Sequence, residues 1–177
     1  GGANLKVVRM FDEMKEEVKD WKDEEEIKAY LLRLLNKEAF DHSGLIYGMG
    51  HAVYSISDPR AQIFKGYLGK LAIEEGYEDE FHFYETVERL ATELITSRRK
   101  IYKGVSANID FYSGFMYRML GLPDQLFTPM FAVARVVGWS AHRIEELMNC
   151  DKIIRPAYQS IAAEETYVPL AERNAEE

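Results

Sequence analysis

The sequence predicts an all-α protein. Apolar residues recur at helical spacing in nearly every segment of the 177-residue chain, and no run alternates with the period of two that a half-buried strand requires. Glycine and proline separate these segments, as they do between helices. A hydrophobic content of 47% suffices for the core of one ordinary domain, or of a small domain plus part of a second.

The first two helices are indicated by an apolar stripe and by a capping residue. Lysine and glutamate occupy the other faces of the first helix. Its stripe consists of Leu5, Val8, Met10, Phe11, Met14, Val18 and Trp21. Asp23, followed by Glu26, is typical of the cap of a second helix, which we expect to end near Lys37.

The third and fourth helices follow a glycine-rich loop at residues 43–57. Asp58-Pro59 predicts the start of the third helix, because aspartate caps and the fixed φ of proline suits a first turn. It should run to about Glu75. A fourth helix is expected from Glu80 to about Tyr102, with these residues inward: Phe81, Tyr84, Val87, Leu90, Ala91, Leu94 and Ile95.

The last two helices are separated by a breaker. The segment 106–108 opens a fifth helix that continues through Leu120, and Gly121-Leu122-Pro123 closes it. Thr128-Pro129 then begins a long sixth helix that reaches about Asn149 and is apolar on most sides. The pattern beyond this helix predicts an extended, acidic arm.

Charge and cysteine content narrow the function class. The formal net charge of −8 would repel nucleic acid and anionic membranes. Cys150 is the single cysteine and suits a reducing compartment, while the apolar stretch from Met130 to Ala141 is too short to span a bilayer. We therefore expect a soluble, cytoplasmic protein. The chain opens Gly-Gly-Ala-Asn without an initiator methionine, so we expect that upstream residues have been removed.

Three clusters of residues carry possible chemistry. They are Gly48 to Tyr54 with Asp58-Pro59-Arg60, then Asn108 to Gly114, then Arg135 to Arg143 with Arg155-Pro156. Guanidinium groups bind carboxylates in paired hydrogen bonds, and a carboxylate base beside a histidine donor suits enolisation. The set therefore favours a small polycarboxylate substrate. No metal-ligand spacing is present, so we expect no metal site.

Each residue also has a structural interpretation. His51 alone would more often be an ordinary loop histidine, and Asp110 alone a first-turn residue that the helix dipole favours. Arg135 lies on a mostly apolar helix, so we expect a buried charge that requires a partner or a ligand.

Four motifs in this order resemble citrate synthases and their methylcitrate synthase relatives. They are Gly-x-Gly-His-Ala-Val-Tyr with Asp-Pro-Arg, Asn-x-Asp-Phe-Tyr-Ser-Gly, Leu-Phe-Thr-Pro-x-Phe-Ala-x-Ala-Arg with Gly-Trp-x-Ala-His, and Arg-Pro-x-Tyr. The resemblance runs from the first residue to about Tyr158. It implies a small helical domain on the coenzyme A side at residues 1–120, and the C-terminal helix and arm of a large domain at residues 121–177.

The resemblance also implies an activity and a set of roles. The family's homodimeric acyltransferases condense acetyl-CoA with oxaloacetate and hydrolyse the citryl thioester, with acetyl-CoA as co-substrate and no metal. Asp110 would take the proton from the acetyl methyl group, and His51 would donate to the oxaloacetate carbonyl. Arg60 and Arg135 would hold substrate carboxylates within the subunit, and Arg155 would do so across the dimer interface.

Coenzyme A contacts are implied at three further positions, namely Gly48, Gly50 and Lys103. An aspartate with an ordinary pKa of about 3.9 needs a second donor to stabilise the enol. In the family this donor is a histidine directly before the segment that here is Gly1 to Asn4, so we expect the chain alone to be inactive. Two alternatives stay open: a 2-methylcitrate synthase that uses propionyl-CoA, and a non-catalytic helical module that binds coenzyme A.

Overall fold

The computed structural model describes residues 2–54, 56–99 and 104–149. Within these ranges the fold is helical, and the one extended pairing is an isolated antiparallel bridge between Met49 and Ala107. The prediction of an all-α protein is confirmed. The elements are α1 (Ala3–Glu17), α2 (Glu24–Leu35), α3 (Pro59–Glu75), α4 (Glu78–Arg99), α5 (Ile109–Met119), the 3-10 turn η1 (Asp124–Leu126) and α6 (Phe127–Asn149).

Three helices begin at side chains that accept hydrogen bonds from their own first turns. Asp23 caps α2, Asp58 caps α3 and Asn108 caps α5. Such caps satisfy amide groups that have no partner inside the helix. The first helix is shorter than its apolar stripe predicts, because α1 ends at Glu17 and Trp21 instead stacks on Phe83 with ring centroids 5.2 Å apart.

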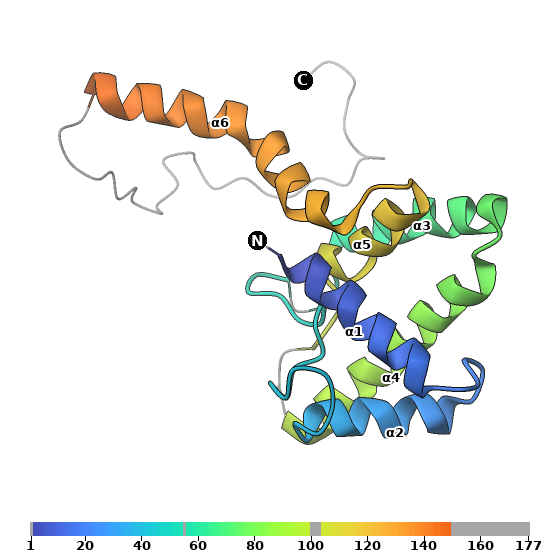
Figure 1. Ribbon diagram of the computed structural model, residues 1–177. Helices are drawn as coiled ribbons and strands as arrows, with labels where there is room; N and C mark the ends of the chain where they lie inside the picture. The colour runs from blue at the N-terminus through green and yellow to red at the C-terminus, as the bar shows by residue number, and fades with distance from the viewer. Residues whose placement is uncertain (1, 55, 100–103, 150–177) are drawn as a thin grey trace, which may run out of the picture. The chain divides into compact units, whose positions relative to one another are not determined.

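The core lies where α5 packs against α1 and α3, and where α4 packs against α2 and α3 (Figure 1). Its centre is aromatic and comes from three helices. Phe11 of α1 stacks on Tyr84 of α4 at 3.6 Å between ring centroids, and Phe111 of α5 meets Phe11 edge-on at 5.5 Å. All three side chains are buried, so this cluster fixes the first turn of α5 against the rest of the core.

The compact unit that contains this core ends at Val136, and the rest of α6 belongs to a second unit. Phe127 begins α6 fully buried, with its ring 5.3 Å from that of Tyr117. The expected domain boundary after residue 120 stays a prediction. Of the described helices, none combines the length and the apolar character that a membrane span requires.

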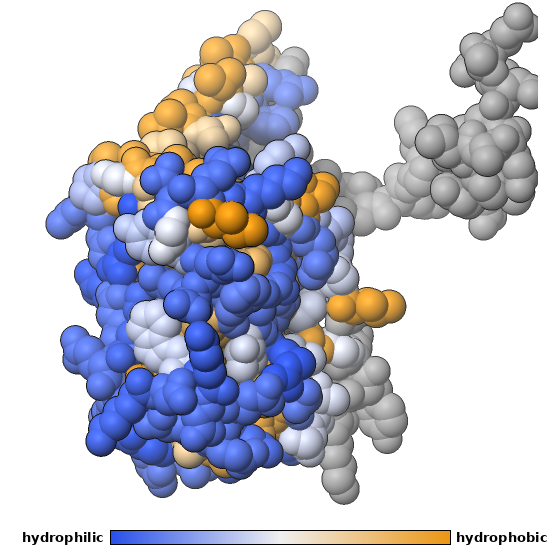
Figure 2. All heavy atoms as spheres, turned by 90° about the vertical axis from the view of Figure 1, so that its right-hand side faces the viewer, coloured by the Kyte–Doolittle hydropathy of each residue, from blue (hydrophilic) through white to orange (hydrophobic). Residues whose placement is uncertain are grey.

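Apolar side chains are exposed along α6, and Figure 2 shows them gathered on that helix. In a packed protein such side chains normally face a neighbour. The exposed set is Met130, Val133, Val136, Val137, Trp139, Ile144, Leu147 and Met148.

Candidate functional site

The glycine-rich loop is tied to the segment that precedes α5. The Gly50 amide donates to the Ser106 carbonyl at 2.8 Å, and the Asn108 amide donates to the Gly48 carbonyl at 2.9 Å. The side-chain amide of Asn108 also donates to the Gly50 carbonyl at 2.9 Å. Asn108 therefore caps α5 and holds the loop at the same time. The sequence placed Asn108 at the opening of this helix and in the motif Asn108 to Gly114, and gave no sign that it also holds the loop.

Gly48 crosses the first turn of α5 at a distance that excludes any side chain. Its φ is +83°, and a Cβ added there would lie 2.8 Å from Cα of Phe111. Gly50 has a φ of +89° but open space around it. Both positions favour glycine, and Gly48 requires it sterically. The close approach at Gly48 is thus to α5, and the coenzyme A contacts expected at Gly48 and Gly50 stay predictions.

Arg60 is held by the residue that starts its helix. Oδ1 of Asp58 accepts from the backbone amide and from Nε of Arg60, each at 3.0 Å, and Oδ2 accepts from Nη2 at 2.8 Å. Asp58 is fully buried, yet its pairing with the Arg60 guanidinium outweighs burial and lowers the pKa of Asp58. The sequence identified Asp58 as a cap and missed this second role, which the Asp-x-Arg spacing at a helix start could have indicated.

His51 is oriented by the backbone that follows it. Its Nδ1 accepts from the amide of Val53 at 3.0 Å and from that of Tyr54 at 3.1 Å. A neutral imidazole that accepts at Nδ1 carries its proton on Nε2, which is then a donor. Nε2 lies 3.2 Å from Nη2 of Arg60. Because a guanidinium cannot accept, the two nitrogens present donors side by side, as one oxygen acceptor would require.

Asp110 is the second residue of α5 and is half-buried. Burial raises its pKa, while the positive charge of Arg60 acts in the opposite direction. Arg60 and His51 both lie near enough to influence the pKa of Asp110, so the three groups share one electrostatic neighbourhood. Among the described residues no side-chain hydrogen bond to its carboxylate is found. A half-buried carboxylate with a raised pKa, near a cation and a donor, is the kind of group that serves as a general base.

Arg135 does not meet the expectation of a buried charge. It is exposed on α6, and its guanidinium lies over the ring of Phe131 at 5.9 Å from the centroid. The expectation failed because the apolar faces of α6 are themselves exposed. Lys103 and Arg155 lie outside the described residues, so the predicted coenzyme A contact and the predicted contact across a dimer stay predictions.

A cavity of about 260 Å³ adjoins the glycine-rich loop. Its walls combine apolar side chains with glycine backbone, which suits a flat, uncharged group. In the part of the chain that the structure describes, no group of three histidine, cysteine or acidic residues could hold a metal ion. The cavity is lined by Leu35, Gly44, Leu45, Ile46, Met49, Gly50, His51, Ile95, Gly104 and Val105.

Comparison with known proteins identifies the family of this chain. The family model described as "Citrate synthase, C-terminal domain" matches residues 1–157. The chain belongs to the citrate synthase family. A citrate synthase of Synechocystis sp. is 37% identical over 98% of this chain and 39% of its own length. A 2-methylcitrate synthase of Shewanella oneidensis is 33% identical over 98% of this chain and 41% of its own length.

A solved citrate synthase agrees in three dimensions. The Thermoplasma acidophilum enzyme, solved as a ternary complex with carboxymethyl coenzyme A and oxaloacetate, matches with a TM-score of 0.60 and 30% identity, over 97% of this chain and 42% of that one. The chain thus spans about two fifths of the length of these citrate synthase relatives. Its described residues contain the histidine, arginine and aspartate motifs together in one compact unit.

Proposed function

We propose that this chain supplies part of the active site of a citrate synthase, which condenses acetyl-CoA with oxaloacetate when the rest of the relatives' length is present. The observation that carries the proposal is the pair of donors formed by His51 and Arg60, 3.2 Å apart. The raised pKa of Asp110, caused by burial, adds a base beside them. Two donors and a base match a reaction that enolises one carbonyl compound and polarises another.

Each residue then has a defined step. Nε2–H of His51 donates to the keto oxygen of oxaloacetate, and Arg60 neutralises a substrate carboxylate. Asp110 removes a proton from the acetyl methyl group, and the resulting enol carbon forms a bond to the polarised keto carbon. The keto C=O double bond opens, and its oxygen takes the proton from Nε2 of His51 and becomes the hydroxyl group of the product. Water then adds its hydroxyl to the thioester carbon and a proton to the leaving thiolate, which releases citrate and the coenzyme A thiol, and the proton on Asp110 returns to His51 through solvent. Burial helps the base, because a raised pKa makes an ionised carboxylate a stronger acceptor of protons.

A second donor must stabilise the enol oxygen, and we expect it to lie next to the start of α1. A Cβ added at Gly114, one turn after Asp110, would lie 3.1 Å from the carbonyl oxygen of Asn4. The first turn of α1 therefore packs closely on α5. The family's enol-stabilising histidine directly precedes the position of Gly1. A polypeptide of these 177 residues by themselves should be inactive, since loss of one such donor costs about a hundred- to a thousand-fold in rate.

The remaining contacts are part of the same proposal. Gly50 lines the cavity beside the loop, where coenzyme A would lie against the backbone, with Lys103 as a phosphate contact. Gly48 would act through the shape that it gives the loop. Arg135 would reach a substrate carboxylate only in the assembled enzyme, and Arg155 would come from the other subunit of a homodimer.

Propionyl-CoA is the alternative acyl donor, because the relatives include a 2-methylcitrate synthase at 33% identity. The two donors differ by one methylene, and such a difference is worth only about 1–3 kcal/mol in a pocket. Turnover of the natural full-length protein with each acyl-CoA separates these functions. A module that binds coenzyme A without catalysis would turn over neither.

The experiment is a thiol-release assay with oxaloacetate on the full-length protein and on the Asp110→Asn variant. The amide keeps the shape of the side chain but cannot take a proton, so we expect a loss of roughly 10²- to 10⁴-fold in kcat with oxaloacetate binding retained. The matched control is Asp79→Asn, at an exposed aspartate of α4 paired with Lys22. Near-normal turnover by Asp110→Asn would remove Asp110 from the mechanism.

A further inference from the structure

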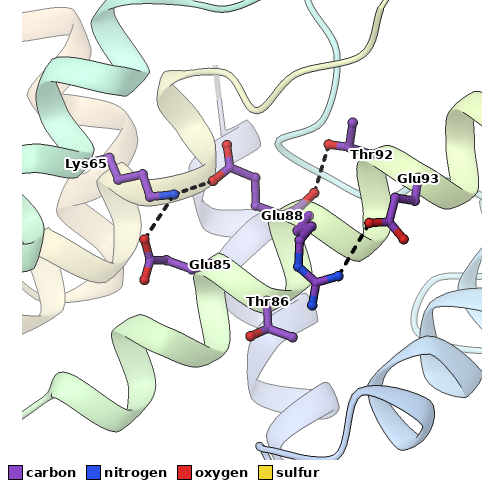
Figure 3. Close-up of a pocket in the computed structure, with 7 residues that line it drawn as sticks. Lys65, Glu85, Thr86, Glu88, Thr92 and Glu93 are labelled. Atoms are coloured by element: carbon purple, nitrogen blue, oxygen red, sulfur yellow. Dashed lines mark hydrogen bonds and ion pairs between the residues drawn. The ribbon is translucent and has the colours of Figure 1, made fainter.

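One carboxylate oxygen, on a residue outside the proposed substrate-binding set, joins three helices. Oε2 of Glu88, on α4, accepts from Nζ of Lys65, on α3, at 2.8 Å. The same oxygen accepts from the hydroxyl of Tyr112, on α5, in a short hydrogen bond. Figure 3 shows the ammonium of Lys65 directed at Glu88 and at Glu85, with Glu85 at 3.2 Å. We call Lys65, Glu88 and Tyr112 the three-helix junction.

The three-helix junction is largely shielded from water. Tyr112 is 1% exposed, and the side chains of Glu88 and Lys65 are 16% and 24% exposed. Burial, and then the adjacent Glu88 carboxylate, raise the pKa of Tyr112 far above its usual range, so its hydroxyl keeps the proton that it donates. Burial acts to lower the pKa of Lys65, but the bond to Glu88 outweighs it and the pKa is raised. Both donors thus meet a charged acceptor, which makes short, directional bonds.

A polar group in this place costs desolvation that apolar side chains of similar volume would avoid. Directional bonds fix positions more closely than apolar contacts do, which is a role that buried polar networks can serve. The simplest interpretation is that the network only stabilises the fold. The position of the three-helix junction in the fold argues that it also positions residues of the site.

The three-helix junction is close to both halves of the site along the chain. Lys65 follows Arg60 by five residues on α3, and Tyr112 follows Asp110 by two residues on α5. At 1.5 Å per residue these separations are roughly 7.5 Å and 3 Å along the helix axes. The helix that carries Glu88 contributes no residue to the proposed chemistry. Glu88 is therefore placed between the helix of the substrate-binding arginine and the helix of the base.

We infer that Glu88 is a positioning residue that holds Asp110 in register with Arg60 through Tyr112 and Lys65. The inference rests on the proposed condensation reaction. It predicts that the two bonds to Glu88 work as one unit, because α3 and α5 are joined through this carboxylate only when both bonds are made.

The test uses the full-length protein and three variants. Glu88→Gln removes the charge that Lys65 and Tyr112 share and leaves Lys65 its ion pair with Glu85. Tyr112→Phe removes the hydroxyl and keeps the ring, and the third variant combines the two. Each single variant should lower kcat about tenfold, since small misplacements of reacting groups are costly. The double variant should lower it no further, and KM for oxaloacetate should change less than about twofold, because Asp58 still holds Arg60. Glu93→Gln, at an exposed glutamate of α4 paired with Arg89, is the control and should keep full kcat.

Denaturation curves and the wild-type rate make the outcomes distinct. A drop in unfolding free energy with unchanged kcat overturns the inference, since a structural network would behave in that way. Losses of kcat that multiply in the double variant also overturn it, because the two bonds would then act separately. A wild-type protein without condensation activity refutes the proposed function itself, and the positioning role falls with it.

Discussion

Nε2 of His51 lies 3.2 Å from Nη2 of Arg60, although neither nitrogen accepts a hydrogen bond from the other in the tautomer that the backbone selects. Two independent sets of local hydrogen bonds bring these two nitrogens together. A turn of the chain fixes the imidazole, and the carboxylate of Asp58 fixes the guanidinium. The pair is thus preorganised by residues that need not touch the substrate, which is how binding groups keep their geometry before a ligand arrives.

Asp58→Asn should separate the two roles of that aspartate. Asparagine caps helices about as well as aspartate, so α3 should begin normally. Its neutral amide loses the charged bonds to Arg60, each worth about 1.5–3 kcal/mol, so KM for oxaloacetate should rise roughly tenfold or more. Steady-state kinetics of the full-length protein provide the measurement. The control is Asp23→Asn. Asp23 caps α2 but, among the described residues, its side chain holds no arginine, so this variant should leave KM unchanged.

Asp110→Asn should stabilise the protein in a pH-dependent way. Burial raises the pKa of Asp110 in the folded state above the unfolded value of about 3.9, so the folded state binds the proton more tightly. The ionised carboxylate therefore lowers stability above its folded pKa, and this cost fades as the pH falls towards about 4. The variant should melt higher than wild type at neutral pH and equally at acidic pH. Thermal melts across this range test the sign, and a lower melting temperature at neutral pH would contradict it.

Gly48→Ala should destabilise the fold more than Gly50→Ala does. Both positions have positive φ, near +83° and +89°, so an alanine at either pays the left-handed backbone cost of about 1–2 kcal/mol. Only at Gly48 would the new Cβ also lie 2.8 Å from Cα of Phe111. We expect an additional loss of about 1–3 kcal/mol there, as for overpacked cores. Equal losses in urea denaturation would show that the loop can move away from α5.

Val133→Lys should reduce self-association of the 177-residue polypeptide. Val133 is 67% exposed on α6, among other exposed apolar side chains, and such surfaces associate. Sedimentation velocity at several concentrations gives the measurement, and thermal stability should hardly change. Ile73→Lys on α3 replaces a side chain that is 64% exposed and should have little effect on association. An equal effect of both variants would mean that net charge, and not the face of α6, controls association.

The helices could be predicted from the sequence because their signals are local. Asp58 and Pro59 start α3 as expected, and Gly76 ends it with a φ of 77°. The end of α1 was misplaced, since Trp21 shares the apolar period but packs on Phe83 from a turn. Periodicity alone cannot distinguish a helical turn from a loop residue that reaches the same core.

The site was predictable only in part, for the same reason. His51, Arg60 and Asp110 stand in motifs that can be recognised along the chain. The bonds that hold Arg60 and the bonds that meet at Glu88 depend on side-chain directions, and those at Glu88 join α3, α4 and α5. The exposure of Arg135 could not be inferred either, since an apolar helix predicts a partner surface without saying where that surface comes from.

The hydrogen bond from Asn108 to the glycine-rich loop has a consequence for the order of folding. This bond, to the carbonyl of Gly50, joins residues that are 58 positions apart in the sequence, whereas the bonded pair Asp58 and Arg60 are two positions apart. Closing the longer loop costs more chain entropy. We therefore expect the bonds between Asp58 and Arg60 to form together with α3, and the alignment of His51 with Asp110 to come later. Hydrogen exchange at the Gly50 and Asn108 amides would report that closure. If the bonds between Asn108 and the loop opened briefly, the site would lose activity while every helix kept its own backbone hydrogen bonds.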